Sequence, residues 1–233
     1  MTGPPNEGSR GRGIEPVGPD PVVGEARWHM AGAVLAAMVL TLLLPSEFRL
    51  GPRWLLPILE GSLLVVLIVA DPGRISKRSS VLRGFSIALV TVLIAQSLWS
   101  TARLIDELIV GGPHTDKPGP LLAAAAVVWV SNNIAFALLY WELDSGGAAA
   151  RAHGLPDHPD LAFPQQMNPD IAPENWRPRF IDYLYLAFTN ATAFSPTDAM
   201  PLVPWAKMAM TVQATISLAV LGLVVARAVN VLT

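Results

Sequence analysis

Five blocks of mainly apolar residues, separated by polar segments, constrain the fold of this chain more than any other feature. The blocks cover approximately residues 28–44, 54–70, 81–104, 121–141 and 204–232. A helix needs about 20 such residues to cross a bilayer core about 30 Å thick. Backbone polar groups in hydrocarbon are paired only within helices or closed barrels, so blocks of this length favour helices. The sequence therefore predicts an all-α, polytopic (multi-pass) protein of the cell membrane with five transmembrane helices.

Composition narrows the class of protein further. Of the 233 residues, 52% are hydrophobic and only 15% are charged, whereas a soluble domain carries roughly 25% charged residues. A net charge of −2 offers no basic surface for nucleic acid. The absence of cysteine excludes disulfides and thiolate metal sites. The expected partners are the lipid bilayer and other membrane chains, as a homo-oligomer or as a subunit of a larger membrane complex.

Polar segments divide the chain into four regions. Residues 1–26, rich in glycine and proline, are predicted to be a disordered tail. Residues 27–142 hold four apolar blocks, and residues 143–179 form a loop whose repeated prolines prevent a long helix. Residues 180–233 contain an apolar stretch at 180–194 that is too short to span, then a polar turn and the last block. The short stretch is predicted to be a re-entrant half-helix.

Basic residues set the expected orientation. Four of them gather around the loop between the second and third blocks: Arg74, Lys77, Arg78 and Arg83. Lys and Arg near span ends favour the cytoplasmic side. This bias places the N-terminus in the cytoplasm and, with five spans, the C-terminus outside.

Tryptophans stand at the ends of several blocks. These residues are Trp28, Trp54, Trp141 and Trp205. The indole ring prefers the headgroup level of a bilayer, so they are expected to form an aromatic belt at the membrane surface.

Polar side chains inside the blocks are the first candidate functional residues, because an ionisable group at membrane depth is costly to bury. Glu60 is the only acid well inside a block. It is either paired with Arg103 or hydrogen-bonded to Gln96, or it is a proton or cation site. The intramembrane polar residues are Glu60, Gln96, Asn132, Asn133 and Gln213.

Signatures of catalysis are absent from the sequence. It has no nucleotide-binding loop, nucleophile elbow or H-E-x-x-H motif. Glu60 or Asp182 could act as an acid or base, but neither has a partner constellation in the sequence. We expect no enzyme activity, no cofactor and no metal site.

The segment at 181–207 carries the strongest functional pattern. A short amphipathic stretch runs into a hydroxyl-rich turn, and prolines lead from the turn into the last block. Pro196 ends the helix, since the residue before a proline leaves the α region. The candidate pore-lining or ion-contacting residues are Thr192, Phe194, Ser195, Thr197 and Asp198.

This order of half-helix, polar turn and inner helix resembles the pore loop of potassium channels. Thr192, Phe194 and Asp198 correspond to the threonine, aromatic residue and aspartate of that filter, whose backbone carbonyls replace the water of the ion. Both filter glycines are missing here. In those channels the loop enters from outside, whereas the charge bias of this chain places it inside.

Several short motifs are distributed over the chain. They are F-A-L-L-Y at 136–140, F-P at 163–164, D-Y-L-Y-L-A-F at 182–188, T-D at 197–198 and A-V-N at 228–230. With the basic second loop, they resemble an uncharacterised family of five-span bacterial integral membrane proteins that carries a degenerate potassium-channel-like pore loop. The resemblance implies the five-span fold and says little about activity.

Two functions follow from these patterns. The first is an ion-channel-like pore that passes small cations along the turn at 192–198. The alternative is a non-transporting membrane scaffold or an accessory subunit of a larger membrane complex. Replacement of Asp198 by asparagine should separate them, because only a pore would lose flux.

Overall fold

The computed structural model describes residues 24–75, 77–112, 114, 116–154, 158–173, 176–192 and 198–232. Helices dominate these residues, which confirms the predicted all-α class. They are α1 (Trp28–Leu43), α2 (Leu55–Ala70), α3 (Ser80–Val110), α4 (Pro118–Leu143), α5 (Ala148–Ala152), α6 (Pro164–Met167), α7 (Phe180–Thr192) and α8 (Pro204–Leu232). Short 3₁₀ turns connect them at η1 (Ser46–Phe48), η2 (Asp144–Gly146) and η3 (Pro169–Ile171). Residues 1–23 of the predicted tail and residues 193–197 of the predicted turn lie outside the described residues.

Proline and glycine fix the helix ends. Helix α2 ends at Ala70, immediately before the sequence Asp71-Pro72-Gly73. Helix α3 ends before Gly111, whose φ of 91° is a conformation that L-residues with side chains rarely adopt. Helices α4 and α8 begin at Pro118 and Pro204, where the missing amide hydrogen costs nothing.

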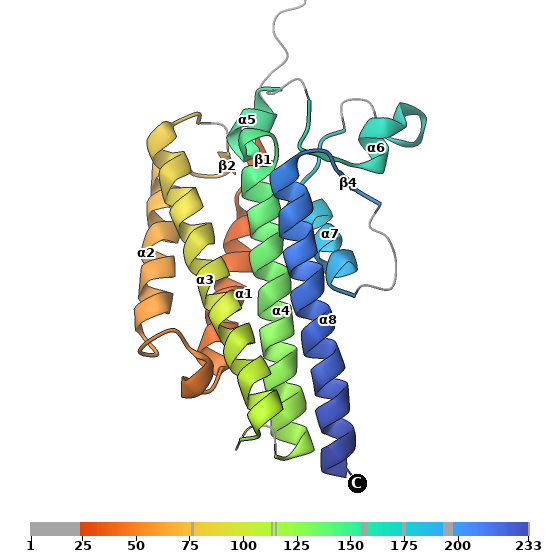
Figure 1. Ribbon diagram of the computed structural model, residues 1–233. Coiled ribbons are helices and arrows are strands. Elements are labelled where there is room, and N and C mark those ends of the chain that lie inside the picture. The colour runs from red at the N-terminus through yellow and green to blue at the C-terminus, as the bar shows by residue number, and fades with distance from the viewer. Residues whose placement is uncertain are drawn as a thin grey trace, which may run out of the picture.

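Within the described ranges, three helices are long and apolar enough to cross a membrane: α3, the segment Pro118–Gly146 that contains α4, and α8 as far as Asn230. Helices α1 and α2 are also apolar but have only 16 residues each. At 1.5 Å per residue they extend about 24 Å. Their lower ends therefore stop short of those of α3, α4 and α8 (Figure 1).

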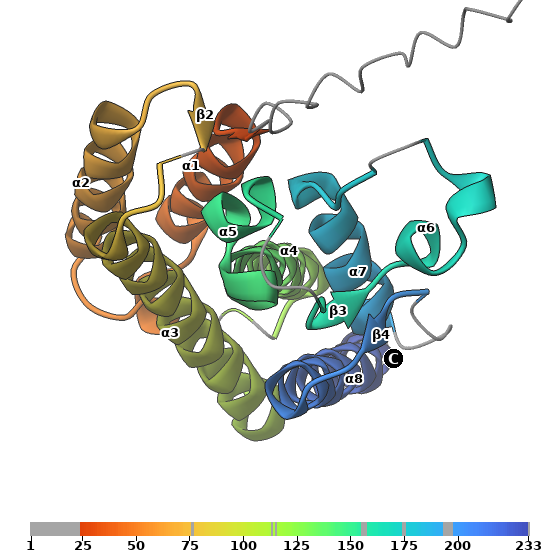
Figure 2. The same ribbon diagram turned by 90° about the horizontal axis from the view of Figure 1, so that it is seen from above.

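Helix α4 is the centre of the bundle. It contacts α1, α3, α7 and α8, and the end view shows it enclosed between α1–α3 on one side and α7–α8 on the other (Figure 2). Over half of its apolar window is buried (56%), against 28% for α3 and for α8. The outer helices therefore keep apolar faces exposed, with Val69 75%, Val225 63% and Leu218 62% accessible. Exposure of so many large apolar side chains is unusual for a protein that faces only water.

The connecting segments sort onto two ends of the bundle. At one end, β1 (Glu25–Ala26) pairs antiparallel with β2 (Arg74–Ile75), and β3 (Leu161–Ala162) pairs with β4 (Met200–Pro201). We call this the basic end, because the described residues there include Arg27, Arg74, Lys77, Arg78, Arg83, Arg151, Arg177 and Arg179.

The other connections between the long helices lie at the opposite end of the bundle. Glu47 lies 3.3 Å from His114, and Arg227 forms an ion pair of 2.8 Å with Asp116. The turn at 44–54, the turn at 111–117 and the end of α8 therefore meet there.

The tryptophan expectation is partly wrong. Trp28 and Trp54 are 69% and 61% exposed, as interfacial residues would be. Trp141 is only 2% exposed, because its indole nitrogen donates to Glu25 and its ring packs against Phe180. Trp141 thus holds the segment before α1 in place, and it is not part of an aromatic belt at the membrane surface.

A buried carboxylate holds the proline-rich loop to the bundle. Asp144 is fully buried and accepts hydrogen bonds from the backbone amides of Asp160 and Leu161, both at 3.0 Å. It also accepts from the hydroxyls of Ser145 and Tyr183. These bonds satisfy a charge that would otherwise be costly to bury. The loop is therefore fixed against α4 and α7 despite its lack of long helices.

Arg151 strengthens the same junction. Its guanidinium donates to the carbonyl oxygens of Trp141 and Asp144, both at 2.7 Å. It also lies 5.0 Å from the ring centre of Tyr183, within cation–π range.

We expect Asp144→Ala to destabilise the protein by about 3 kcal/mol, because the amides of Asp160 and Leu161 and the Tyr183 hydroxyl lose a buried acceptor. That cost corresponds to a fall in melting temperature of about 6–12 °C for a chain of this size. Asp170→Ala is the matched control, since Asp170 is an exposed acid of the same loop. Thermal unfolding of the purified protein in detergent checks both variants, and equal melting temperatures would contradict the structural role of Asp144.

Candidate functional site

The short apolar stretch predicted at 180–194 forms α7, a helix of 13 residues beside the first half of α8 (Figure 1). Apolar residues at helical spacing form its buried face: Phe180, Tyr183, Leu186, Ala187 and Ala191. This face packs on α4 and α8. Its other face is exposed, with Ile181 60%, Tyr185 58% and Phe188 49% accessible.

A buried amide fixes the position of α7 along the bundle. Gln213 of α8 is fully buried, and its Oε1 accepts from the Tyr140 hydroxyl and from Asn190 Nδ2, both at 2.8 Å. Its Nε2 donates to the Ala187 carbonyl at 2.9 Å. Asn190 also donates to the Met210 carbonyl at 2.9 Å. This junction, which we call the Gln213 junction, ties α4, α7 and α8 together.

The described segments before and after α7 both lie at the basic end. Before α7, the Phe180 amide donates to Glu25, which also accepts from Trp141. After it, the Leu202 amide donates to the Asp160 carbonyl at 2.9 Å, and the Trp205 indole donates to the Asp160 carboxylate at 3.3 Å. Phe180 at the start of α7 and residues 200–205 after it therefore lie at the same end of the bundle.

The predicted turn residues are only partly described. Thr192 is half-buried, and its hydroxyl donates to the Thr189 carbonyl of the same helix at 2.9 Å. Asp198 is exposed and shares with Asp182 the lining of a small cavity of about 70 Å³. Phe194, Ser195 and Thr197 lie outside the described residues.

Glu60 has neither of the partners that the sequence suggested. It is fully buried, and among the described residues neither carboxylate oxygen has a hydrogen-bond partner. Gln96 instead accepts from the Leu50 amide and donates to the Ser100 hydroxyl. Gln96 and Ser100 both contact the turn around η1, because the Ser100 hydroxyl also bonds to the Phe48 carbonyl. Arg103 forms an exposed ion pair with Asp106 at 2.9 Å. Glu60 is therefore a buried acid of α2 that forms no hydrogen bond and no ion pair with the described part of the chain.

The central amides of α4 differ in their contacts. Asn133 donates to the Trp129 carbonyl at 2.9 Å, a bond within its own helix. Asn132 is 2% exposed, and neither polar atom of its side chain has a partner within the described part of the chain. Buried hydroxyls in the same condition lie on α3, α4 and α8: Ser97, Thr101, Ser131 and Ser217. Among the described residues, no cluster of three or more His, Cys, Asp or Glu could hold a metal ion.

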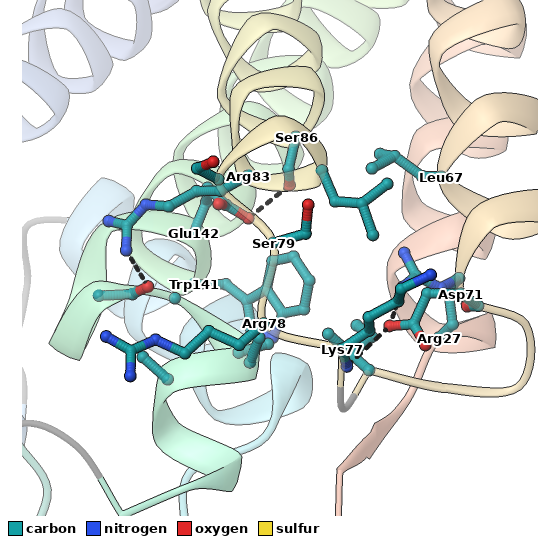
Figure 3. Close-up of a pocket in the computed structure, with 18 of the residues that line it drawn as sticks. Arg27, Leu67, Asp71, Lys77, Arg78, Ser79, Arg83, Ser86, Trp141 and Glu142 are labelled. Atoms are coloured by element: carbon teal, nitrogen blue, oxygen red, sulfur yellow. Dashed lines mark hydrogen bonds and ion pairs between the residues drawn. The ribbon is translucent and has the colours of Figure 1, made fainter.

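A second site, which the sequence reading missed, is a cavity of about 510 Å³ at the basic end (Figure 3). We call it the basic pocket. It lies between the end of α2, the start of α3 and the α4–α5 connection. Its charged and hydroxyl lining is Arg27, Asp71, Lys77, Arg78, Ser79, Ser80, Arg83, Ser86, Glu142 and Ser145, and its apolar lining includes Leu67, Ile75, Leu82 and Trp141.

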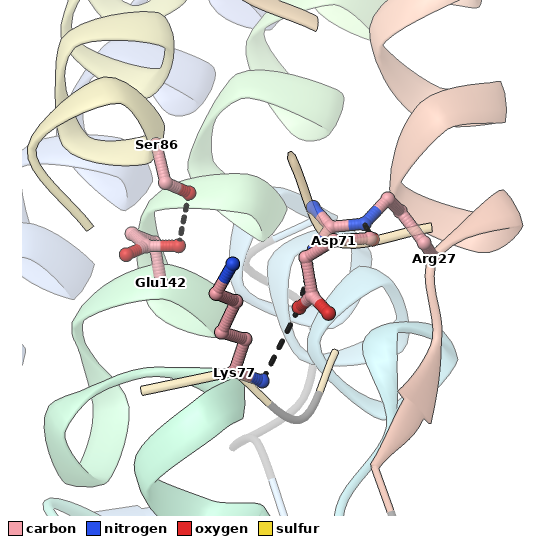
Figure 4. Close-up of polar contacts among 5 residues, drawn as sticks. All are labelled: Arg27, Asp71, Lys77, Ser86 and Glu142. Atoms are coloured by element: carbon pink, nitrogen blue, oxygen red, sulfur yellow. Dashed lines mark hydrogen bonds and ion pairs between the residues drawn. The ribbon is translucent and has the colours of Figure 1, made fainter. Parts of the chain in front are cut away.

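Two pairs of contacts frame this pocket (Figure 4). On one side Arg27 forms a buried ion pair with Asp71 at 3.0 Å, and Asp71 also accepts from the Lys77 amide at 3.3 Å. On the other side the Ser86 hydroxyl donates to Glu142. The side chain of Lys77 extends between the two pairs (Figure 4).

The remaining cations line the opening. The guanidinium of Arg83 donates to the Gly146 carbonyl. The side-chain nitrogens of Lys77 and Arg78 have no hydrogen-bond or ion-pair partner in the described ranges, and both residues are exposed. The pocket therefore presents positive charge that the described residues do not neutralise.

We expect Gln213→Leu to destabilise the protein by about 2–3 kcal/mol, because Tyr140 and Asn190 both lose a buried acceptor. Ser217→Ala is the matched control on the same helix, since the buried Ser217 hydroxyl has no partner among the described residues. The control should change stability by less than about 0.5 kcal/mol. Thermal unfolding in detergent distinguishes the two, and a Gln213→Leu variant as stable as the control would contradict the junction.

Comparison with protein-family models, with characterised proteins and with solved structures gives no match for this chain. The similarity to five-span membrane proteins and to potassium-channel pore loops therefore remains a sequence-based expectation.

Proposed function

We propose that the chain is an integral membrane protein with five crossings and a re-entrant half-helix, α7. The sorting of the connections onto two ends supports this arrangement, because α1, α2, α3, α4 and α8 each run from one end toward the other. The basic end would face the cytoplasm, as the excess of Lys and Arg there favours. The N-terminus would then be cytoplasmic and the C-terminus outside.

The lengths of the helices are consistent with a bilayer around the upper part of the bundle in Figure 1. The α1–α2 pair ends at a turn that carries Arg49 and Arg53, both polar anchors for a membrane surface. Beyond this level α3, α4 and α8 continue (Figure 1), and the charged residues on these extensions and on the turn between α3 and α4 include Asp106, Glu107, Asp116, Lys117 and Arg227. These charges would lie in water, and the two 16-residue helices would cross with their flanking apolar residues.

The function that we propose is the passage of small cations beside α7. The observation that supports it is that α7 ends at Thr192, part of the way along α8, and is held there by the Gln213 junction. The last carbonyl groups of a helix lack partners within that helix and carry partial negative charge. Half-helices that end within a membrane use such C-terminal carbonyls to coordinate cations.

A path of this kind needs neighbouring copies of the chain. The outer face of α7 is exposed, and the adjoining faces of α8 are exposed at Met208 63% and Val212 41%. Backbone that is not helical is tolerated at membrane depth only where protein buries it or where it lines water. A homo-oligomer that places the α7 faces around a shared axis would satisfy this requirement.

An accessory or scaffold role is the second candidate, and the proline-rich loop favours it. Helix α6 and η3 stand away from the bundle (Figure 2). They expose Met167 at 47% and Ile171 at 64%. Exposed apolar side chains on a projecting loop fit a docking segment for another subunit.

Flux into liposomes separates the two candidates. The wild-type protein is reconstituted into vesicles that contain a potassium-sensitive dye, and the rate of potassium entry is compared with that of protein-free vesicles. Asp198→Asn should lower the rate by about threefold or more, because a carboxylate at the mouth concentrates cations. Asp170→Asn is the matched control, since Asp170 is an exposed acid that does not line the cavity beside α7.

If potassium enters vesicles with the wild-type protein no faster than protein-free vesicles, cation passage is contradicted. The accessory or scaffold role then becomes the remaining candidate. Equal rates for Asp198→Asn and the wild type would show that Asp198 takes no part in the path.

A further inference from the structure

The chemistry of the basic pocket is independent of cation passage. Formal charges on its lining are positive for Arg27, Lys77, Arg78 and Arg83, and negative for Asp71 and Glu142. Arg27 and Asp71 neutralise each other in their buried ion pair. The remaining residues leave an excess of positive charge at the opening. The pocket is therefore matched to an anion.

The walls of the pocket are apolar beneath this charged opening. Leu67, Ile75 and Trp141 are buried side chains of the lining, and Leu82 and Ala149 are half-buried. A free inorganic anion would gain nothing from these walls. An anionic group that carries an apolar chain would contact the cations and the walls at the same time.

The surroundings of the pocket face the bilayer in the proposed arrangement. Helix α3 lines the pocket with Leu82 and Ser86 and turns Val81 and Phe85 outward, 65% and 36% exposed. The end of α2 exposes Val69 at 75%. Apolar surface that would contact lipid tails thus adjoins the cationic opening at the cytoplasmic level.

We propose that the basic pocket binds an anionic phospholipid, with the phosphodiester headgroup held by Lys77 and Arg78 and the start of an acyl chain along Leu67 and Leu82. The volume of about 510 Å³ falls within the range of about 300–1,000 Å³ that small-molecule sites occupy. Basic pockets between helices at the cytoplasmic surface are suited to phospholipid headgroups. The hydroxyls of Ser79 and Ser80 in the lining add donors for phosphate oxygens. This proposal rests on the membrane placement of the chain and not on cation passage.

Native mass spectrometry of the full chain in detergent tests the site. The protein is titrated with phosphatidylglycerol, with phosphatidylcholine of the same acyl chains, and separately with inorganic phosphate. The wild type should retain one phosphatidylglycerol with an affinity at least tenfold above that for phosphatidylcholine. Lys77→Gln/Arg78→Gln should lower the phosphatidylglycerol affinity by about tenfold to thirtyfold.

Two further variants show whether the pocket itself is responsible. Arg53→Gln/Lys117→Gln removes one Arg and one Lys that are exposed at the opposite end, and it should leave the affinity within about twofold. Ala149→Phe fills the pocket without a change of charge and should abolish the tight binding. An unchanged melting temperature in lipid-free detergent shows that each variant is folded.

Three outcomes would overturn the proposal. Equal affinity of the wild type for the two lipids would show that no anionic headgroup is recognised. Retention by Lys77→Gln/Arg78→Gln would assign these cations to membrane orientation alone. Competition by millimolar inorganic phosphate as strong as that by phosphatidylglycerol would identify the ligand as a free anion. If the wild-type protein binds phosphatidylglycerol but gives no potassium flux above that of protein-free vesicles, cation passage would be overturned and the lipid site would stand.

Discussion

The position of α7 depends on one buried side chain, the amide of Gln213. An amide in an apolar bundle must find partners, and here each of its two polar atoms has at least one. Because Tyr140 and Asn190 share its oxygen, α4, α7 and α8 cannot slide past one another without leaving a buried polar atom unpaired. A half-length helix has too little surface to fix its own depth, so this polar junction, together with the apolar face of α7, sets where the helix ends.

A second set of polar contacts, at the basic end, holds the start of α7 and the segment that leads into α8. Asp144 fixes the start of the proline-rich loop, Glu25 receives the first amide of α7, and Asp160 receives the segment that leads into α8. The same end carries the unneutralised cations of the basic pocket. Helix α7 is therefore held by the Gln213 junction and by the contacts at the basic end, where the cations of the basic pocket also lie. The proposed cation path and the proposed lipid site lie on opposite sides of α4.

The sequence predicted the helices well, because long apolar runs bounded by proline and glycine leave few alternatives; the stretch expected at 180–194 is α7 at Phe180–Thr192. It could not predict the basic pocket, whose lining comes from residue 27, from 67–86 and from 141–150. Nor could local pattern show that Trp141 and Asp144 are buried, since their partners Glu25 and Leu161 are distant in the chain. The partners expected for Glu60 were wrong because Gln96 and Arg103 contact other groups, the Leu50 amide and Asp106.

Re-entry of α7 is the central claim, and thiol labelling tests it most directly because the chain contains no cysteine. Single variants Arg179→Cys and Asp198→Cys flank α7, while Lys77→Cys and Lys117→Cys mark the basic and opposite ends. In intact cells, a membrane-impermeant maleimide should label Lys117→Cys alone, and permeabilisation should expose the other three. Labelling of Arg179→Cys and Asp198→Cys from opposite sides would contradict the account, because α7 would then cross the membrane completely.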